Sequence, residues 1–322
     1  MGARRDVLVI AAYRMLLNLA GLLLPLSSPM DPSIWVSLNY GTLAAGGLVG
    51  YLFGFRRPQK IMLAMTPLLF IWYPYTMPIA MFGLGILDPL ATPMIYEKHG
   101  DKAVSLVSSL TSFGIAASGL LLLLPPFIPF LLLPSVLLLP SMSRKTNVKQ
   151  AVASSLNVET ALFAASTFIL GGLYTIFLAR MSGIPYAKYM LAAAAVSMGM
   201  IRLASHKLQK WLYAFIIAAG LGFIMFAFNY ALFLLFILPY AVIYPMITML
   251  AGKHGRKDPT TAINAAFAGV GTGSAVLPAA SRSINVLVFP SVLIAIGALM
   301  AIVNRLQLVS FYRVNKKFAN RL

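Results

Sequence analysis

Residues 77–102 read MPIAMFGLGILDPLATPMIYEKHGDK. Segment 77–97 is an apolar run with one carboxylate, Asp88, near its centre and a second, Glu97, at its end, and a polar turn that contains two lysines follows at 98–102. A helix of about 20 mostly apolar residues is long enough to cross the hydrocarbon core of a bilayer. The stretch therefore predicts a transmembrane helix that ends in a basic loop.

Similar apolar runs occur on both sides of this stretch, separated by short connections that carry Pro, Gly, Asn or charged residues. They predict an all-α integral membrane fold of twelve transmembrane helices, with ten as the alternative number. The expected spans are 7–26, 34–55, 60–75, 77–97, 103–123 and 126–142, followed by 158–179, 186–206, 210–228, 230–251, 260–280 and 284–305.

The composition requires a bilayer as solvent. Sixty per cent of the residues are hydrophobic, 10% are charged and the mean hydropathy is +0.87, which leaves too few polar residues to cover a water-soluble surface. The net charge of +18 is therefore not read as a nucleic-acid site. The chain has no Cys, which excludes disulfides, Cys-based metal sites and thiol catalysis. We expect no cofactor, no bound metal and no nucleic-acid partner.

The basic residues are distributed unevenly among the connections. All of the 25 Lys and Arg residues except Arg14, Arg180, Lys188 and Arg282 fall in alternate connections, a set in which we include Arg202. Lys and Arg accumulate in cytoplasmic loops of membrane proteins. The pattern predicts a multi-pass protein of the cell membrane with an even number of spans and with both termini in the cytoplasm.

The two halves of the chain share short matching segments. KHGDK at 98–102 matches KHGRK at 253–257, and segment 43–60 resembles segment 191–210. Because each half has an even number of predicted spans, the two repeats enter the membrane from the same side, which makes them parallel repeats of the kind found in transporters. The predicted domains are an N-terminal six-helix bundle (1–142), a cytoplasmic linker (143–152) and a C-terminal six-helix bundle (153–322).

The connection after the second span resembles the signature of the major facilitator superfamily, Gly-x-x-x-Asp-Arg/Lys-x-Gly-Arg/Lys-Arg/Lys. The segment GYLFGFRRPQK at 50–60 has the first glycine, Gly50, and the basic cluster with Arg56 and Arg57, but Gly54 stands where the family has Asp. The equivalent segment of the second half, with Gly199 and Lys207, is also basic and also lacks the acid. The resemblance covers nearly the whole chain and implies two six-helix halves that move about a central site.

Two charged residues inside predicted spans are the main candidates for a substrate or coupling site. A carboxylate at the position of Asp88 is costly in a membrane and usually faces a cavity or a partner, so Asp88 either binds substrate or a proton or anchors a neighbouring helix. Arg14 either faces the same cavity or extends its side chain toward the headgroups. An Arg14–Asp88 pair would favour a gating or zwitterion-binding role. The other candidates are polar residues within spans, Asn18, Tyr240, Tyr244 and Asn264.

Prolines in equivalent spans of the two halves are candidate hinges, because proline removes a helical hydrogen bond and kinks the helix. They are Pro89, Pro93, Pro239 and Pro245.

Other residues receive structural interpretations. The glycines at 269, 271 and 273 lack the preceding strand of a dinucleotide site and are expected to allow close helix packing. Glu97 and Asp101 are interpreted as loop charges, and Glu159 as a residue at the membrane interface. The three histidines, His99, His206 and His254, are assigned to connections without the spacing of metal ligands.

These features predict a secondary active transporter of a small organic solute that works by alternating access. Its partners would be the lipid bilayer, the solute and a coupling proton or ion. The protein would act as a monomer, and we do not expect it to be an enzyme. Uniport, symport and antiport remain open. Two alternatives are a membrane-embedded enzyme, for which seven acidic residues in the chain offer few catalytic pairs, and a transporter-like scaffold or receptor.

Overall fold

The computed structural model describes residues 2–26, 29–53, 57–69, 74–120, 134–139, 157–181, 183–184, 186–255 and 258–319. Most of the predicted sixth span, the predicted linker 143–152 and Arg56 lie outside these residues. The described chain is built of helices, which confirms the predicted all-α class. The number of twelve spans and their division into two sixes remain predictions.

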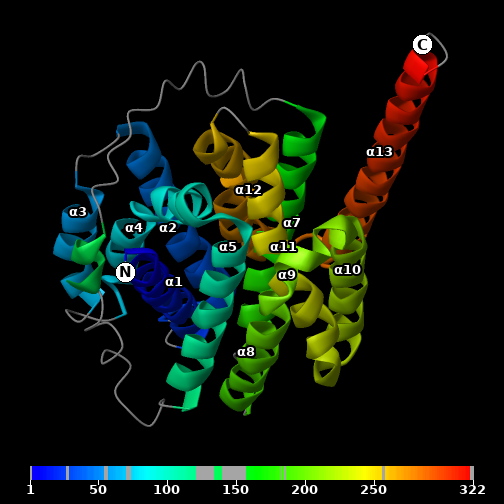
Figure 1. Cartoon of the computed structure of the whole chain (residues 1–322). Coiled ribbons are helices and arrows are strands. Elements are labelled where there is room, and N and C mark those ends of the chain that lie inside the picture. The colour runs from blue at the N-terminus through cyan, green and yellow to red at the C-terminus, as the bar shows by residue number, and fades with distance from the viewer. Residues whose placement is uncertain are drawn as a thin grey trace.

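The chain before residue 121 folds, in its described residues, into five α-helices and a short 3₁₀ helix (Figure 1), and residues 134–138 form a further 3₁₀ turn. They are α1 (Gly2–Leu26), α2 (Pro32–Phe53), α3 (Pro58–Met65), η1 (Thr66–Leu69), α4 (Met77–Gly85) and α5 (Asp88–Leu120).

The second part of the chain forms a further set of helices that lie beside the first. They are α7 (Val158–Met181), α8 (Ala187–Leu203), α9 (Ser205–Leu208), η3 (Gln209–Trp211), α10 (Leu212–Phe228), η4 (Tyr230–Leu232), α11 (Phe233–His254), α12 (Pro259–Ala280) and α13 (Val288–Ala319).

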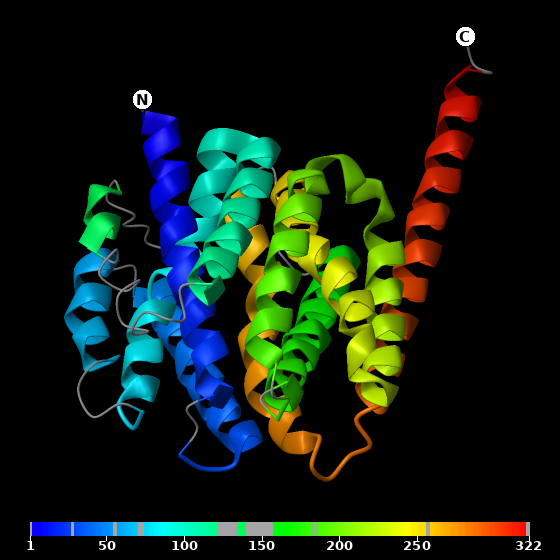
Figure 2. The ribbon, with the colours of Figure 1, turned by 90° about the horizontal axis from the view of Figure 1, so that it is seen from below.

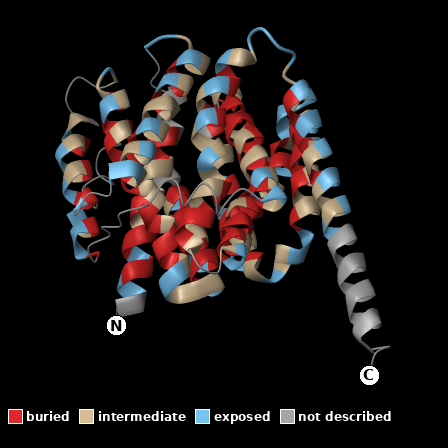
Figure 3. Cartoon of the chain, turned by 90° about the horizontal axis from the view of Figure 1, so that it is seen from above, coloured by how far each residue is buried: buried red, intermediate tan, exposed pale blue. Residues whose placement is uncertain are grey.

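Among the described residues, five helical segments are long and apolar enough to cross a membrane. They are Met77–Ala117, Val158–Met181, Ser205–Phe228, Tyr230–His254 and Pro259–Ala280, and two shorter apolar helices cover Tyr189–Leu203 and Val288–Asn304. Large apolar side chains are exposed on the outer faces of the bundle, among them Leu8, Leu48, Phe228, Val276 and Ile302. Figure 3 shows that the buried residues lie on the inner faces of the helices. Water would not tolerate such a surface, whereas lipid tails solvate it.

Segment 77–117 contains two changes of direction. The helix stops at Ile86–Leu87, between α4 and Asp88, and Gly100 adopts φ 72° and ψ −168°, so that α5 turns sharply there. Glycine is the residue that tolerates this positive φ without steric strain. The predicted boundary between spans 77–97 and 103–123 therefore corresponds to a turn, although helix continues on both sides of it.

Glycines allow the closest helix contacts of the bundle. A Cβ at Gly273 of α12 would clash with the carbonyl oxygen of Phe168 in α7, and a Cβ at Gly269 would clash with that of Ala164. Gly271, between them, faces Ala44 of α2. The expectation that this glycine run serves helix packing is confirmed, because close backbone approach is what small residues permit in membrane helices.

The two most extensive helix contacts between the first and second parts of the chain involve α2 and α5. The helix α2 packs against α12, and the part of α5 beyond Gly100 packs against α8 (Figure 1). The second contact includes a polar bond, from the Ser109 hydroxyl to the Gly199 carbonyl at 2.6 Å, and next to it the hydroxyls of Ser105 in α5 and Ser205 in α9 lie 2.8 Å apart. Figure 2 shows that α1 begins and α13 ends at the same end of the molecule.

Candidate functional site

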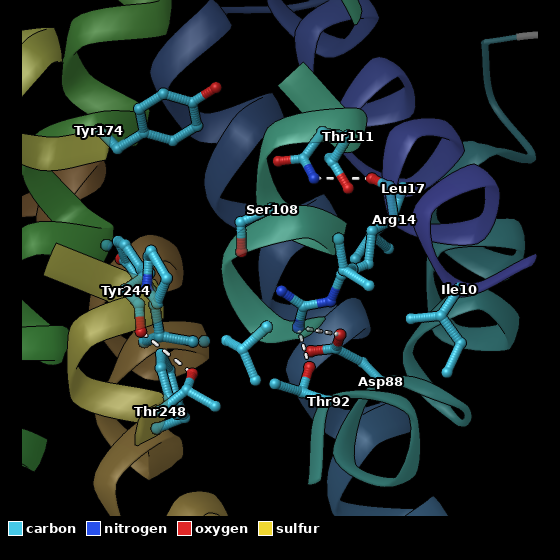
Figure 4. A pocket seen from close by; sticks show the side chains of 18 of the residues that line it. Ile10, Arg14, Leu17, Asp88, Thr92, Ser108, Thr111, Tyr174, Tyr244 and Thr248 are labelled. Carbon is cyan, nitrogen blue, oxygen red and sulfur yellow. Dashed lines mark hydrogen bonds and ion pairs between the residues drawn. The ribbon is translucent and has the colours of Figure 1, made fainter. Parts of the chain in front are cut away.

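A cavity with a volume of about 170 Å³ lies inside the bundle, where helices from both parts of the chain meet (Figure 4). Its lining comes from α1, α2, α5, α7, α8, α11 and α12. Five of the six predicted substrate or coupling residues line it, namely Arg14, Asn18, Asp88, Tyr240 and Tyr244.

An ion pair occupies one side of the cavity. The Nη2 atom of Arg14 lies 3.2 Å from Oδ1 of Asp88, and the same atom donates to the Thr92 hydroxyl. Asn18 donates from Nδ2 to the Arg14 carbonyl at 2.7 Å. Asp88 is the first residue of α5, and the helix N-terminus favours a negative charge there. The structure therefore brings together the two charges that the sequence analysis considered as a pair.

Aromatic rings form the opposite side. Tyr174 stacks on Tyr240 with ring centroids 4.7 Å apart, the Tyr240 and Tyr244 rings meet edge-on at 5.1 Å, and Tyr244 stacks on Phe267 at 5.6 Å. Figure 4 shows Tyr174 and Tyr244 facing Arg14 and Asp88 across the cavity. The cavity thus presents a charged face, from α1 and α5, to an aromatic face, from α7, α11 and α12.

Arg202 is the residue that the sequence analysis misplaced. The pattern of basic residues places Arg202 in a connection, but in the structure it belongs to α8 and lines the cavity. Its Nε donates to the Ala241 carbonyl at 2.8 Å, and its Nη1 donates to the Ser112 hydroxyl at 2.5 Å and the Ser108 carbonyl at 3.3 Å. The sequence feature that indicates a helix position for Arg202 is its place inside the predicted span 186–206, four residues before the end of that span.

Asn264 and Arg202 each donate a hydrogen bond to a backbone carbonyl that a proline leaves without a helical partner. Pro93 and Pro245 have no N–H to donate to the carbonyls four residues earlier, those of Pro89 and Ala241. Asn264 donates to the Pro89 carbonyl at 3.0 Å, and Arg202 donates to the Ala241 carbonyl. Asn264 is not among the residues that line the cavity, and its predicted role in substrate binding stays a prediction.

The remaining predicted positions have packing or surface roles. A Cβ at Gly50 would clash with the Ile86 carbonyl oxygen, and one at Gly199 would lie 2.7 Å from the Phe113 ring, so both glycines allow close helix contacts. Arg57 precedes α3 and is exposed, as is Lys207 in α9. Pro239 lies inside α11.

A polar network closes the end of the bundle that holds the Gly100 turn. Lys253 of α11 places Nζ 2.6 Å from Oδ2 of Asp101 in α5 and donates to Gln209 Oε1 at 2.6 Å, and Gln209 donates to Asp101 at 2.9 Å. Glu97 accepts hydrogen bonds from the Thr260 hydroxyl at 2.5 Å and the Thr260 N–H at 3.2 Å. Glu97 and Asp101 are therefore helix residues that bind the second part of the chain, not isolated loop charges.

Two histidine–carboxylate pairs flank this network. His99 Nε2 lies 3.6 Å from Asp6 Oδ2, and His254 Nδ1 lies 2.9 Å from Glu159 Oε2. In each pair the acid is near the start of a helix, α1 or α7, and the histidine belongs to the matching KHGDK or KHGRK segment. Glu159, interpreted as interfacial, and His254, assigned to a connection, thus form a contact between α7 and α11. Within the described ranges, no group of three metal-ligating side chains is found.

The comparisons identify the fold but no close relative. No protein-family model and no curated protein sequence matches the chain. Among solved structures, the human organic anion transporter MFSD10 (TETRAN) superposes with a TM-score of 0.67 at 13% identity, covering 94% of this chain and 98% of that one. The Escherichia coli fucose:proton symporter FucP superposes with a TM-score of 0.61 at 16% identity, covering 93% and 97%.

Long apolar helices, exposed aliphatic side chains on the outer surface and an internal polar cavity define a polytopic α-helical membrane protein. The chain has the fold of the major facilitator superfamily transporters, as the superpositions over almost the whole length show.

Proposed function

We propose that the protein is a secondary active transporter of a small organic solute and works by alternating access. The observation that carries this proposal is the internal cavity, in which a charged face and an aromatic face meet at the junction of both parts of the chain. The fold supports it, because the solved neighbours are named as transporters. We further propose that the protein works as a monomer.

The proposed architecture is two parallel six-helix halves, 1–142 and 153–322, joined by a cytoplasmic linker. The two His–carboxylate pairs support it, since they join equivalent elements within each half. The common end of α1 and α13 is the proposed cytoplasmic side (Figure 2).

In this arrangement the described conformation is closed at the cytoplasmic end. The Asp101–Lys253–Gln209 network and the Glu97–Thr260 contacts join the halves there. Opening would break these contacts while the halves rock about the cavity. Pro93 and Pro245, which lie inside α5 and α11 beside carbonyls bound by side chains of other helices, are the proposed hinges.

The Arg14–Asp88 pair is proposed to order the charged face and to respond to the solute or a coupling proton. The side chains are 28% and 36% exposed, so both reach the cavity while remaining paired. A solute or proton that competes for either partner would change the contact between α1 and α5. An internal ion pair of this kind is a common basis for coupling in membrane transport.

Flux into proteoliposomes tests the proposal. Purified protein is reconstituted, and the uptake of radiolabelled carboxylates, amines, amino acids and sugars is measured with and without a proton gradient. We expect uptake of at least one class above that of protein-free liposomes. Absence of flux and of coupled pH change for every class would contradict the proposed transport.

Substitutions at the ion pair test the assigned site. Arg14→Ala and Asp88→Ala each leave a charge without its partner, so we expect each to lower uptake at least tenfold. Lys60→Gln, which changes an exposed residue, is the control. Asp88→Asn should abolish proton-dependent stimulation if the carboxylate carries the proton. Coupling that persists in Asp88→Asn would contradict that role, and unchanged uptake by all variants would contradict the site.

A further inference from the structure

The charges of the cavity do not balance. Arg14, Arg202 and Asp88 line it, and Asp88 is paired with Arg14. Arginine remains charged in proteins, so the lining carries one positive charge in excess when the pair is ionised. The excess charge belongs to Arg202, whose described acceptors are two carbonyl groups and one hydroxyl.

No acid of this chain supplies the missing counter-charge. The chain has seven Asp and Glu residues, all within the described ranges, and none forms an ion pair with Arg202. Their contacts lie elsewhere. Asp6 pairs with His99, Asp31 with Arg282, Asp88 with Arg14, Asp101 with Lys253 and Glu159 with His254, while Glu97 binds Thr260 and Asp258 caps α12.

The guanidinium group of Arg202 is held in position by its other atoms. Nε is bound to α11, and Nη1 is bound to α5, so the side chain is fixed between two helices. Within the described part of the chain, no hydrogen bond from Nη2 is found, which leaves two N–H groups for a ligand. A fixed and partly buried cation with free donors is a strong site for an anion, because it has lost part of its hydration without gaining a counter-charge.

The surface beside this charge is aromatic. Tyr174, Tyr240 and Tyr244 line the same cavity and contact one another in series, the first pair stacked and the second edge-on. Rings of this kind contact a planar apolar body over a large area, and their edges orient it. A ligand with a carboxylate at one end and an aromatic ring at the other would match both features.

We propose that the transported solute is an organic anion with one carboxylate and an aromatic body, and that Nη2 of Arg202 binds the carboxylate. This inference rests on the proposed transport function and specifies its substrate class. Because Nε of Arg202 donates to the carbonyl freed by Pro245, an anion at Nη2 also acts directly on the segment of α11 that contains this proline. Substrate binding and movement of that helix then share one side chain.

The first test uses the wild-type protein. Uptake into proteoliposomes is compared for hippurate, an aromatic monocarboxylate, for its neutral amide, for benzyltrimethylammonium and for a neutral sugar. We expect hippurate uptake to exceed that of its amide by about tenfold or more, as expected for a charge-assisted hydrogen bond. Uptake of the amide, the cation or the sugar in preference to hippurate would overturn this inference and leave transport intact, whereas absence of uptake for all four would contradict transport for these classes as well.

The second test measures binding of hippurate to detergent-solubilised variants. Arg202→Gln removes the charge but retains an amide donor, and we expect it to weaken hippurate binding tenfold to a hundredfold while binding of the amide changes less than twofold. Lys60→Gln, which removes an exposed charge, is the matched control. An equal loss for hippurate and its amide would indicate a structural role alone and overturn the proposal. If Arg202→Gln is not recovered in folded form, the wild-type comparison still decides the question.

Discussion

Several polar side chains inside the bundle donate hydrogen bonds to individual backbone carbonyls, and this explains why they lie there. Pro93 and Pro245 each deprive a carbonyl of its helical donor, and Asn264 and Arg202 each donate to the freed group from another helix. A third case is Pro278, which frees the Ser274 carbonyl, and the Thr175 hydroxyl lies 3.5 Å from it. In lipid, an unsatisfied carbonyl is costly, so a proline in a membrane helix requires such a partner.

The first prediction concerns Asn264. Asn264→Leu should remove the donor to the Pro89 carbonyl and destabilise the protein by about 1–3 kcal/mol, the cost of an unsatisfied buried acceptor. Pro93→Ala restores a backbone N–H for that carbonyl, so Asn264→Leu should cost much less in the Pro93→Ala background. Thermal unfolding of the four proteins in detergent measures the difference. Equal losses in both backgrounds would show that Asn264 does not act through this carbonyl.

The sequence predicts the location of a charged residue better when that residue stands alone in an apolar run than when it lies close to other basic residues. Arg14 and Asp88 were identified because each is the only charged side chain near the middle of an apolar run. Arg202 was missed because it lies close to Lys207 and Lys210, and a count of basic residues cannot separate a helix residue from a neighbouring loop. Asn264 was assigned to the cavity because an amide can serve either a ligand or a backbone carbonyl, and only the fold shows which one it faces.

Among the helices, the α7–α12 contact depends most clearly on residue size. Gly273 and Gly269 lie against the backbone of α7, and Gly171 of α7 lies against Val270 of α12. The Thr167 hydroxyl also donates to the Ala266 carbonyl at 2.8 Å, which is a further bond between the two helices. A backbone cannot move aside as a side chain can, so this contact should tolerate no added carbon.

The second prediction follows from that contact. Gly273→Ala should lower the stability of the detergent-solubilised protein by about 1–3 kcal/mol, the usual cost of overpacking, and should lower Tm by several degrees. Gly183→Ala is the matched control, because a Cβ there would meet its nearest neighbour, the Arg180 carbonyl oxygen, at 3.8 Å. A Tm for Gly273→Ala equal to that of Gly183→Ala would contradict the packing described for α7 and α12.

Helix positions follow from hydropathy, but their internal breaks do not. Apolar runs predict α7, α10, α11 and α12 within a few residues. The stop at Ile86–Leu87 inside the predicted span 77–97 is not visible in hydropathy, because both residues are apolar. The turn at Gly100 was expected as a loop from its charged neighbours, whereas the structure confines it to one residue with a positive φ.

For the whole molecule, the repeat found in the sequence has a counterpart in space. Segment 98–102 and the described part of the matching segment, 253–255, lie at one end of the bundle, where Asp101 of the first contacts Lys253 of the second. Each segment also places its histidine against an acid near the start of α1 or α7. Short matches that are weak as sequence signals gain weight because they occupy equivalent and adjoining positions in the fold.

The fold resembles solved transporters at identities of 13% and 16%, so the chain retains an arrangement of helices rather than a set of residues. Composition and charge distribution therefore predict an all-α membrane protein, and the superfamily fold enters as a resemblance, whereas the substrate has to be inferred from side chains that only the folded chain brings together. Arg202, its three acceptors and the tyrosine stack come from four helices, and no local pattern connects them.

The third prediction concerns movement of the two halves about the cavity. The chain has no native Cys, so a pair introduced by Asp101→Cys and Lys253→Cys can be cross-linked specifically. A reducible bis-methanethiosulfonate reagent joining these positions would hold closed the end at which the wild-type side chains lie 2.6 Å apart. The two single-Cys variants and the wild type, treated with the same reagent, are the controls.

The rate of solute uptake by the double-Cys protein in liposomes, before cross-linking, after it and after reduction, tests alternating access most directly. The proposed mechanism predicts that cross-linking stops uptake, that reduction restores it and that the controls keep their rates throughout. Uptake by the fully cross-linked protein at its original rate would contradict the claim that this end of the bundle must open for transport.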